Sequence, residues 1–280
     1  SSLLNIYFIL NEYSVVYFAL SLFIDLLLSA LFLLIIYHKN GHVFKQWRFS
    51  KKIAINLMKF AWPLALSVFL ISIHTKIDQV MIGNMLDIEQ VGIYSVAVKL
   101  SDAWLFFPAI LVSTFMPYFV DLREVDKKLY QYRLIQLYSL MFWMGVFVGL
   151  VIMLFGESII SLLFGEVYTN AYMALVFNIW NGIFISQAIA RGIWMISENL
   201  QIYRLYSNII VAVLNITINI LLIPMYGIAG AAIATLITQF MGTWVISLFW
   251  KPLRQSSYDM IKSINPIYLI KFIFKNEQKY

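Results

Sequence analysis

Long apolar runs alternate with short polar segments along most of the chain. A helix needs about 20 mainly apolar residues to cross the hydrocarbon core of a bilayer. Seven segments meet this requirement: Ser14–Tyr37, Ile53–Thr75, Val91–Val120, Tyr130–Phe155, Ala171–Ile196, Ile202–Ile223 and Ile228–Trp250. Pro224 and Gly227, in IPMYGIAG, predict a tight turn between the last two. The pattern therefore predicts an all-α, polytopic transmembrane helix bundle with seven spans.

Composition supports a membrane protein. The chain has 280 residues, of which 62% are hydrophobic and 12% charged, whereas soluble domains are about half apolar and a quarter charged. The net charge of +6 does not indicate nucleic acid binding, because the basic residues fall between apolar runs and form no basic, aromatic-rich face. There is no cysteine, and the three histidines have no metal-ligand spacing.

The loop charges predict an orientation. Seventeen of the 20 Lys and Arg residues fall in alternate loops, at the ends of two spans and in the tail after Trp250. Since Lys and Arg accumulate in cytoplasmic loops, these segments and the C-terminus are expected in the cytoplasm. The opposite border carries Asp78, Asp87, Glu89, Glu157 and Glu166, together with Lys76. The tail, 251–280, is interpreted either as a segment lying on the anionic membrane surface or as a partly disordered end.

Four charged residues lie inside the predicted spans: Asp25, Lys59, Lys99 and Asp102. A charge at mid-membrane costs roughly 2.5–3.5 kcal/mol, so such residues usually face a bundle interior or a wet cavity. Lys99 and Asp102 are three positions apart on one helix face, which predicts an inward-facing ion pair. Asp25 is alternatively a satisfied interior carboxylate, and Lys59 can extend its charged end to the membrane surface.

Polar residues recur on single faces of the later spans. The fifth span carries Asn181, Gln187 and Arg191, and the sixth carries Arg204, Asn208, Asn215 and Asn219. The seventh carries Ala231, Thr235, Thr238, Gln239 and Gly242. These faces either line a site or pack helices together, and both interpretations are open. In the second span, Pro63 lacks a backbone donor and predicts a kink.

No catalytic signature is present. The chain has no GxxxxGK[ST], GxSxG or HExxH motif. We therefore expect a non-enzyme without a cofactor, and internal charges in a helix bundle favour a transporter.

Three stretches carry a family resemblance: TKIDQVMIGNMLDIEQVGIYSVAVKLSDAWLFFP, LLFGEVYTNAYMAL and NILLIPMYGIAGAAIATLITQ. Together they resemble the bacterial lipid-linked oligosaccharide flippases of the O-antigen (Wzx) type, within the multidrug/oligosaccharidyl-lipid/polysaccharide exporter superfamily. The resemblance extends over most of the chain from Lys51 to Trp250.

The resemblance implies two six-helix lobes around a central cavity. Residues 1–52 would then be the end of the first lobe and a basic connecting loop, 53–250 the complete second lobe, and 251–280 a cytoplasmic tail. Because residue 1 is Ser and the run Leu3–Leu10 is too short to span, we expect a fragment that lacks most of the first lobe.

The resemblance also implies a substrate, an undecaprenyl-diphosphate-linked oligosaccharide moved from the cytoplasmic to the periplasmic leaflet of the bacterial inner membrane for O-antigen synthesis. Membrane lipid and other polysaccharide-assembly proteins would be its partners. The residues expected to bind the diphosphate are Lys59, Lys76, Lys99 and Arg191, and those expected to bind sugar hydroxyls are Asn181, Gln187, Asn208, Asn215 and Asn219. Asp25, Asp78 and Asp102 would form charge pairs or take a coupling proton or sodium ion, and Pro63 would act as a hinge.

Three alternatives remain open: a multidrug exporter of the same superfamily, a membrane enzyme, and an accessory membrane subunit without transport. The first predicts a cavity dominated by acids. The second predicts a long outer loop bearing Arg or His, which the sequence lacks.

Overall fold

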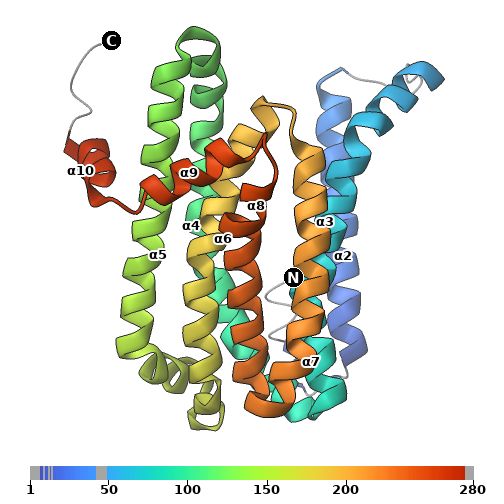
Figure 1. Ribbon diagram of the computed structural model, residues 1–280. Coiled ribbons are helices and arrows are strands. Elements are labelled where there is room, and N and C mark those ends of the chain that lie inside the picture. Colours follow the sequence, from blue (N-terminus) through green and yellow to red (C-terminus); the bar gives the residue numbers. More distant parts are fainter. Residues whose placement is uncertain (1–6, 9, 12, 14, 42–48, 275–280) are drawn as a thin grey trace. The chain divides into compact units, whose positions relative to one another are not determined.

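The computed structural model describes residues 7, 8, 10, 11, 13, 15–41 and 49–274, and every element in this part of the chain is helical. The long helices are α2 (Val15–Lys39), α3 (Lys51–Met85), α4 (Ile88–Val125), α5 (Lys127–Phe164), α6 (Tyr172–Ser197) and α7 (Gln201–Phe240) (Figure 1). The short elements are the 3-10 helix η2 (Glu166–Ala171), the π-helix η3 (Met241–Val245), α8 (Ile246–Phe249), α9 (Arg254–Lys262) and α10 (Pro266–Phe274).

The chain divides into two compact units, 1–58 and 59–280. The first contains α2 and the start of α3. α2 is apolar on nearly all sides and carries Asp25, which is half-buried, at its centre. The second unit contains the rest of α3 and all later helices, and it holds the hydrophobic core.

Aspartate caps set the limits of α4 and α5. Asp87 accepts a hydrogen bond from the backbone N–H of Gln90 at 2.7 Å, which satisfies a free donor in the first turn of α4. Asp126 separates the two helices and accepts from the N–H groups of Lys128 and Leu129. Each helix has 38 residues, or about 57 Å. Both therefore extend beyond the predicted spans, because the caps lie outside the apolar runs.

α7 is a helical hairpin. Gly227 has φ 59° and ψ −139°, a conformation outside the helical region. Two helical arms meet at this residue, and α7 denotes both of them. Asn215 donates to the Thr235 hydroxyl at 3.2 Å across the bend, so the two arms lie side by side. The first arm of α7 is 201–226, and the second arm, 228–240, continues through η3 into α8 (Figure 1). The predicted turn between the last two spans is confirmed.

Five stretches of the described residues are long and apolar enough to cross a membrane, and they fall in α2, α4, α5, η2–α6 and the run from α7 to α8. The last of these contains both arms of the hairpin. α3, the second predicted span, is not among them. The fold is thus an all-α bundle of long apolar helices, and the count of seven spans stays a prediction.

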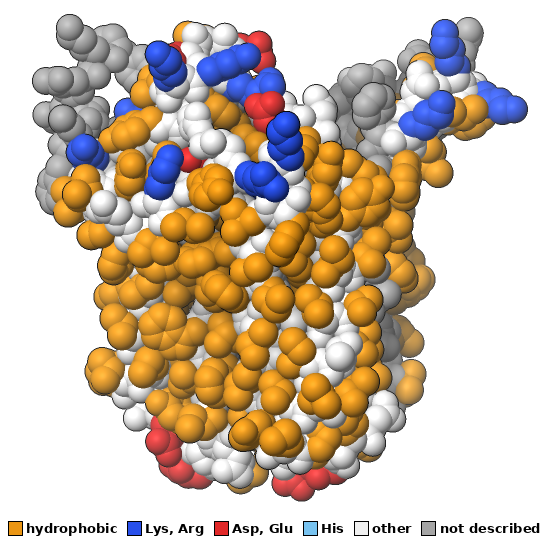
Figure 2. Space-filling view, in the orientation of Figure 1, with side chains coloured by type: hydrophobic (Ala, Val, Ile, Leu, Met, Phe, Trp, Pro, Cys, Tyr) orange, Lys and Arg blue, Asp and Glu red, His pale blue; other side chains and the backbone are white. Residues whose placement is uncertain are grey.

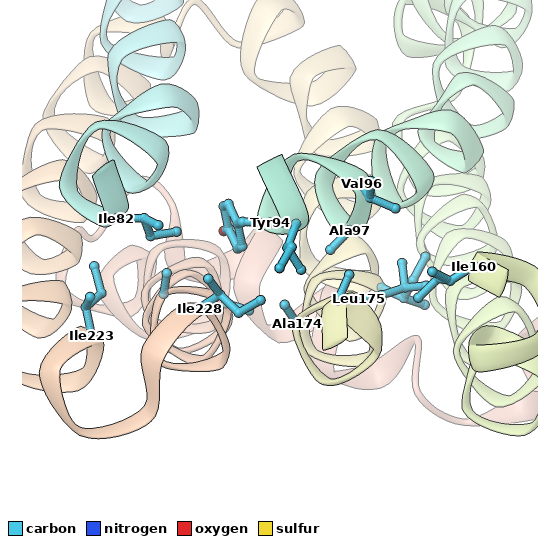
Figure 3. Close-up of a cluster of buried hydrophobic side chains, with 14 of the residues drawn as sticks. Ile82, Tyr94, Val96, Ala97, Ile160, Ala174, Leu175, Ile223 and Ile228 are labelled. Atoms are coloured by element: carbon cyan, nitrogen blue, oxygen red, sulfur yellow. The ribbon is translucent and has the colours of Figure 1, made fainter. Parts of the chain in front are cut away.

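The larger core cluster lies beside the turn between α3 and α4 and the bend of α7. Figure 3 shows Ile82 of α3, Tyr94 of α4, Leu175 of α6 and Ile223 of α7 as members of this cluster. Each of these side chains is almost fully buried. This cluster fixes α3, α4, α6 and the α7 bend against one another at the end of the unit that carries Asp87.

A second cluster holds the opposite end, where α9 and α10 pack. Met260 of α9 is fully buried with Tyr138 and Met141 of α5. The rings of Tyr268 and Phe272 on α10 contact Tyr132 and Phe115, with centroids 6.1 and 6.4 Å apart. The described part of the predicted tail is therefore folded onto the bundle and is not disordered.

Charge is divided between the two ends of the second unit. Figure 2 shows Lys and Arg side chains gathered, together with some Asp and Glu, at the end that carries α9, only Asp and Glu among the charged side chains in view at the opposite end, and an apolar belt between them. This arrangement matches the loop charges read from the sequence.

Gly230 provides a test of the hairpin. A Cβ at this position would collide with the backbone carbonyl of Leu222 in the first arm, which cannot swing aside as a side chain does. We expect Gly230→Ala to lower stability by about 1–3 kcal/mol. The control is Gly92→Ala in α4, where a Cβ meets nothing within 4 Å. Melting temperatures of the two purified variants check this, and equal values would contradict the hairpin packing.

Candidate functional site

Lys76, Lys99 and Asp102 are exposed charged side chains that lie well inside α3 and α4 of the second unit. Lys76 lies nine positions before the end of α3, about 14 Å along the helix. Lys99 lies 11 positions after the start of α4, about 17 Å along it. Since α3 and α4 are joined by a short turn, these charges lie at similar depth. We call Lys76, Lys99 and Asp102 the charged face. Lys59, which is also exposed, lies nearer the start of α3.

The predicted ion pair between Lys99 and Asp102 stays a prediction. The ion pairs recorded for the described residues do not include it. Lys76, on the neighbouring helix α3, is near enough to act electrostatically on Asp102. The charges still gather on one face, but they do so between helices.

Asp78 is the centre of a buried polar network, and its side chain is 3% exposed. Its Oδ1 accepts from Asn219 at 2.7 Å, and its Oδ2 accepts from the hydroxyls of Thr235 at 2.6 Å and Tyr94 at 3.2 Å. Asn219 also donates to Asn215 Oδ1 at 3.0 Å. Three donors from α4 and both arms of α7 therefore converge on one carboxylate. We call these five residues the Asp78 centre.

The Asp78 centre couples helices that are far apart in sequence. Asn219 and Thr235 lie 141 and 157 positions from Asp78. A buried carboxylate is costly unless it is hydrogen-bonded, and here each oxygen receives at least one donor. The sequence had assigned Asn215 and Asn219 to sugar binding and Asp78 to coupling, and the structure brings them into one cluster.

Arg191 lies in a different place, at the basic end, and is 5% exposed. Its Nη1 donates to the Thr243 carbonyl at 2.9 Å and to the Ser247 hydroxyl at 2.8 Å. Thr243 belongs to the π-helix η3, whose wider turn alters the normal backbone hydrogen-bond ladder. The guanidinium thus ties α6 to the end of the last span, so Arg191 is a buried anchor and does not extend to the membrane surface.

A cavity of about 290 Å³ adjoins this anchor. Its polar lining includes Arg191, Arg204, Ser207, Asn208 and Gln239, from α6 and both arms of α7. We call it the arginine cavity. In the sequence, Arg204 and Asn208 share one predicted helix face with Asn215 and Asn219. The structure divides that face, because the last two belong to the Asp78 centre.

A second, smaller cavity of about 200 Å³ lies at the same end and includes Arg123, Glu198 and Asp259. Arg123 pairs with Glu198 at 2.9 Å, and Asp259 accepts from Gln131 and Gln255. Burial raises the pKa of the Asp259 carboxyl above its ordinary value, while these hydrogen bonds act in the opposite direction. Acids and bases offset each other here, so this cavity selects neither sign of charge.

The remaining predicted site residues lie apart from these clusters. Gln187 is fully buried, donates to Ser263 at 3.1 Å and accepts from Trp244 Nε1 at 2.8 Å, so it holds α9 against the bundle. Asn181 is buried in α6 with an Oδ1 that has no recorded partner. Asp25 lies in the first unit. α3 continues through Pro63, whose side chain lies outside the described residues.

Long apolar helices, charged ends and an apolar belt define a multi-pass membrane protein. Residues 2–123 match the profile of the family described as polysaccharide biosynthesis protein. The chain is also similar to the capsular polysaccharide biosynthesis protein CapF of Staphylococcus aureus, with 27% identity over 243 residues. That alignment covers 81% of this chain and 61% of CapF, so the chain spans about three fifths of its relative's length. No solved structure matches.

Both similarities are to proteins described as polysaccharide biosynthesis proteins. The family match ends at residue 123, so it includes the charged face and Asp78 but not α6 or α7. The arginine cavity therefore rests on the structure alone.

Proposed function

We propose that this chain is part of a flippase of the O-antigen (Wzx) type that moves an undecaprenyl-diphosphate-linked oligosaccharide from the cytoplasmic to the periplasmic leaflet. In this proposal residues 53–250 are a six-helix lobe of a two-lobe transporter. It would act without a cofactor and without catalysing a covalent step. The matches to polysaccharide biosynthesis proteins support the substrate class.

The observation that carries the proposal is the charged face. Lys76, Lys99 and Asp102 are exposed well inside the length of α3 and α4. Exposure of such groups to acyl chains costs roughly 2.5–3.5 kcal/mol each, so this face is expected to border water. Two lysines give it a positive balance, which lowers the barrier for a diphosphate that must leave the cytoplasm.

The Asp78 centre is proposed as the coupling site, where a proton or sodium ion would bind as substrate moves. It joins α3 and α4 to the α7 hairpin, so occupancy there can alter how the charged face is held. The membrane potential is an additional driving force for translocation, because outward movement of an anion is favoured by about 2.3 kcal/mol per charge per 100 mV.

The orientation belongs to the same proposal. Seventeen of the 20 Lys and Arg residues lie at one border or in the tail, and this end would face the cytoplasm, with the protein in the bacterial inner membrane. A multidrug exporter of soluble cations is the nearest alternative. The excess of lysine over aspartate on the charged face speaks against it.

Lys99→Ala tests the role of the charged face. We expect it to lower flipping of a lipid-linked oligosaccharide in vesicles at least tenfold while expression changes less than twofold, because one of two lysines that meet the diphosphate is lost. The matched control is Lys128→Ala, which removes an exposed charge at the basic end. If Lys99→Ala vesicles flip at the wild-type rate, Lys99 is not part of the transport site.

A further inference from the structure

The arginine cavity has an imbalance of charge. Two guanidinium groups, from Arg191 and Arg204, line it, and its lining contains no aspartate or glutamate. The ion pairs recorded in the described ranges join other bases to acids. Arg191 has neutral partners, Thr243 and Ser247. Buried charges in proteins are normally paired, so two like charges around one space indicate a missing anion.

Two other polar groups of the cavity are donors without partners. The Ser207 hydroxyl and the Asn208 Nδ2 are buried and have no hydrogen-bond partner in the structure. Ser207 is 6% exposed and lines the cavity. An unsatisfied buried donor costs about 1–3 kcal/mol, so two adjacent ones beside two guanidinium groups mark a place where an acceptor-rich ligand binds.

Part of the wall is apolar. Ile185, Ile189, Met195 and Val211 form this apolar part of the lining. At about 290 Å³ the space is at the lower end of ligand pockets, which are about 300–1,000 Å³. It can take a head group but not a whole oligosaccharide. A charged head beside an apolar wall is the composition that an amphiphile requires.

We propose that the arginine cavity binds the phosphate or diphosphate head of an amphiphilic lipid at the basic end of the bundle. Arg204, Ser207 and Asn208 donate to the phosphate oxygens, and Arg191 adds charge while it stays anchored to η3. The inference rests on the proposed function for its biological role, since a diphosphate head is also that of the proposed substrate. The cavity is separate from the charged face, which lies on α3 and α4. The two are therefore separate binding sites for an anion.

Binding to the full-length protein tests the proposal. The protein in phosphatidylcholine nanodiscs is titrated with farnesyl diphosphate in one arm and with short-chain phosphatidylglycerol in the other, by calorimetry. We expect saturable binding in at least one arm, and the arm that binds identifies the source of the phosphate. Arg204→Gln is expected to raise the Kd at least tenfold, because a charge-assisted contact is lost. This side chain has no recorded bond to the described residues, so the fold is expected to persist.

Two further variants make the result specific. Asn208→Leu removes an unpartnered donor and should weaken binding in the same arm. Lys251→Gln removes one exposed charge at the same end and should change the Kd less than twofold. No binding in either arm, or equal Kd values for wild type and Arg204→Gln, would overturn the proposal. Flipping assays separate the two ideas: flipping without binding here refutes only this cavity, and binding without any flipping refutes only the flippase.

Discussion

Asp78→Ala is expected to abolish transport and to destabilise the second unit by about 3 kcal/mol or more. The substitution removes the acceptor for Asn219, Thr235 and Tyr94 at once. These donors are enclosed among packed helices, so water does not readily replace the carboxylate. Melting temperature and flipping rate of the purified variant measure the two effects.

Asp78→Asn separates the charge from the packing. The amide keeps the volume and one acceptor oxygen, and Asn219 can turn its own amide to accept from the new donor. We expect a melting temperature closer to the wild type and flipping reduced at least tenfold, since the ionisable group is gone. Wild-type flipping by Asp78→Asn would show that Asp78 is structural and takes no coupling ion.

Arg191→Ala has the second largest expected effect, a loss of about 2–4 kcal/mol of stability. The Thr243 carbonyl and the Ser247 hydroxyl lose their buried donor, and a void replaces the side chain. Because these groups lie in η3 and α8, we expect the last span to loosen first. Hydrogen exchange of residues 241–249 measures this directly.

Arg191→Lys is the matched control. It keeps a positive charge and a long stem, but a single ammonium cannot reproduce the planar geometry of the guanidinium. An intermediate loss of protection is expected. If Arg191→Ala leaves the exchange of residues 241–249 unchanged, Arg191 does not anchor the π-helix.

Local sequence signals predicted much of the fold. The apolar runs locate α2, α4, α5 and α6, and Pro224 with Gly227 locates the bend of α7. Span ends were less accurate, because Asp87 and Asp126 cap helices beyond the apolar runs. The helices α9 and α10 of the tail were not predicted, because they depend on packing of Met260, Tyr268 and Phe272 against α4 and α5.

The site was harder to predict, because its contacts join distant residues. Asp78 and Asn219 were singled out for separate roles, and nothing within one helix indicates that their side chains meet. Gln187 was predicted to bind a sugar, yet its side-chain amide is hydrogen-bonded to Ser263 and Trp244. Tyr94 and Ser207 were not singled out as site residues. A tyrosine or serine in an apolar helix is a weak signal until the neighbouring helix is known.

The central claim is that the charged face borders water inside the membrane. The chain contains no cysteine, so one introduced thiol can be followed alone. Lys99→Cys in intact membranes is treated with a membrane-impermeant maleimide, which requires a hydrated thiolate. The control is Leu154→Cys, an exposed apolar position on α5 ten positions before its end, at nearly the depth of Lys99. We predict labelling at Lys99→Cys and none at Leu154→Cys. Equal protection of the two thiols would contradict the account.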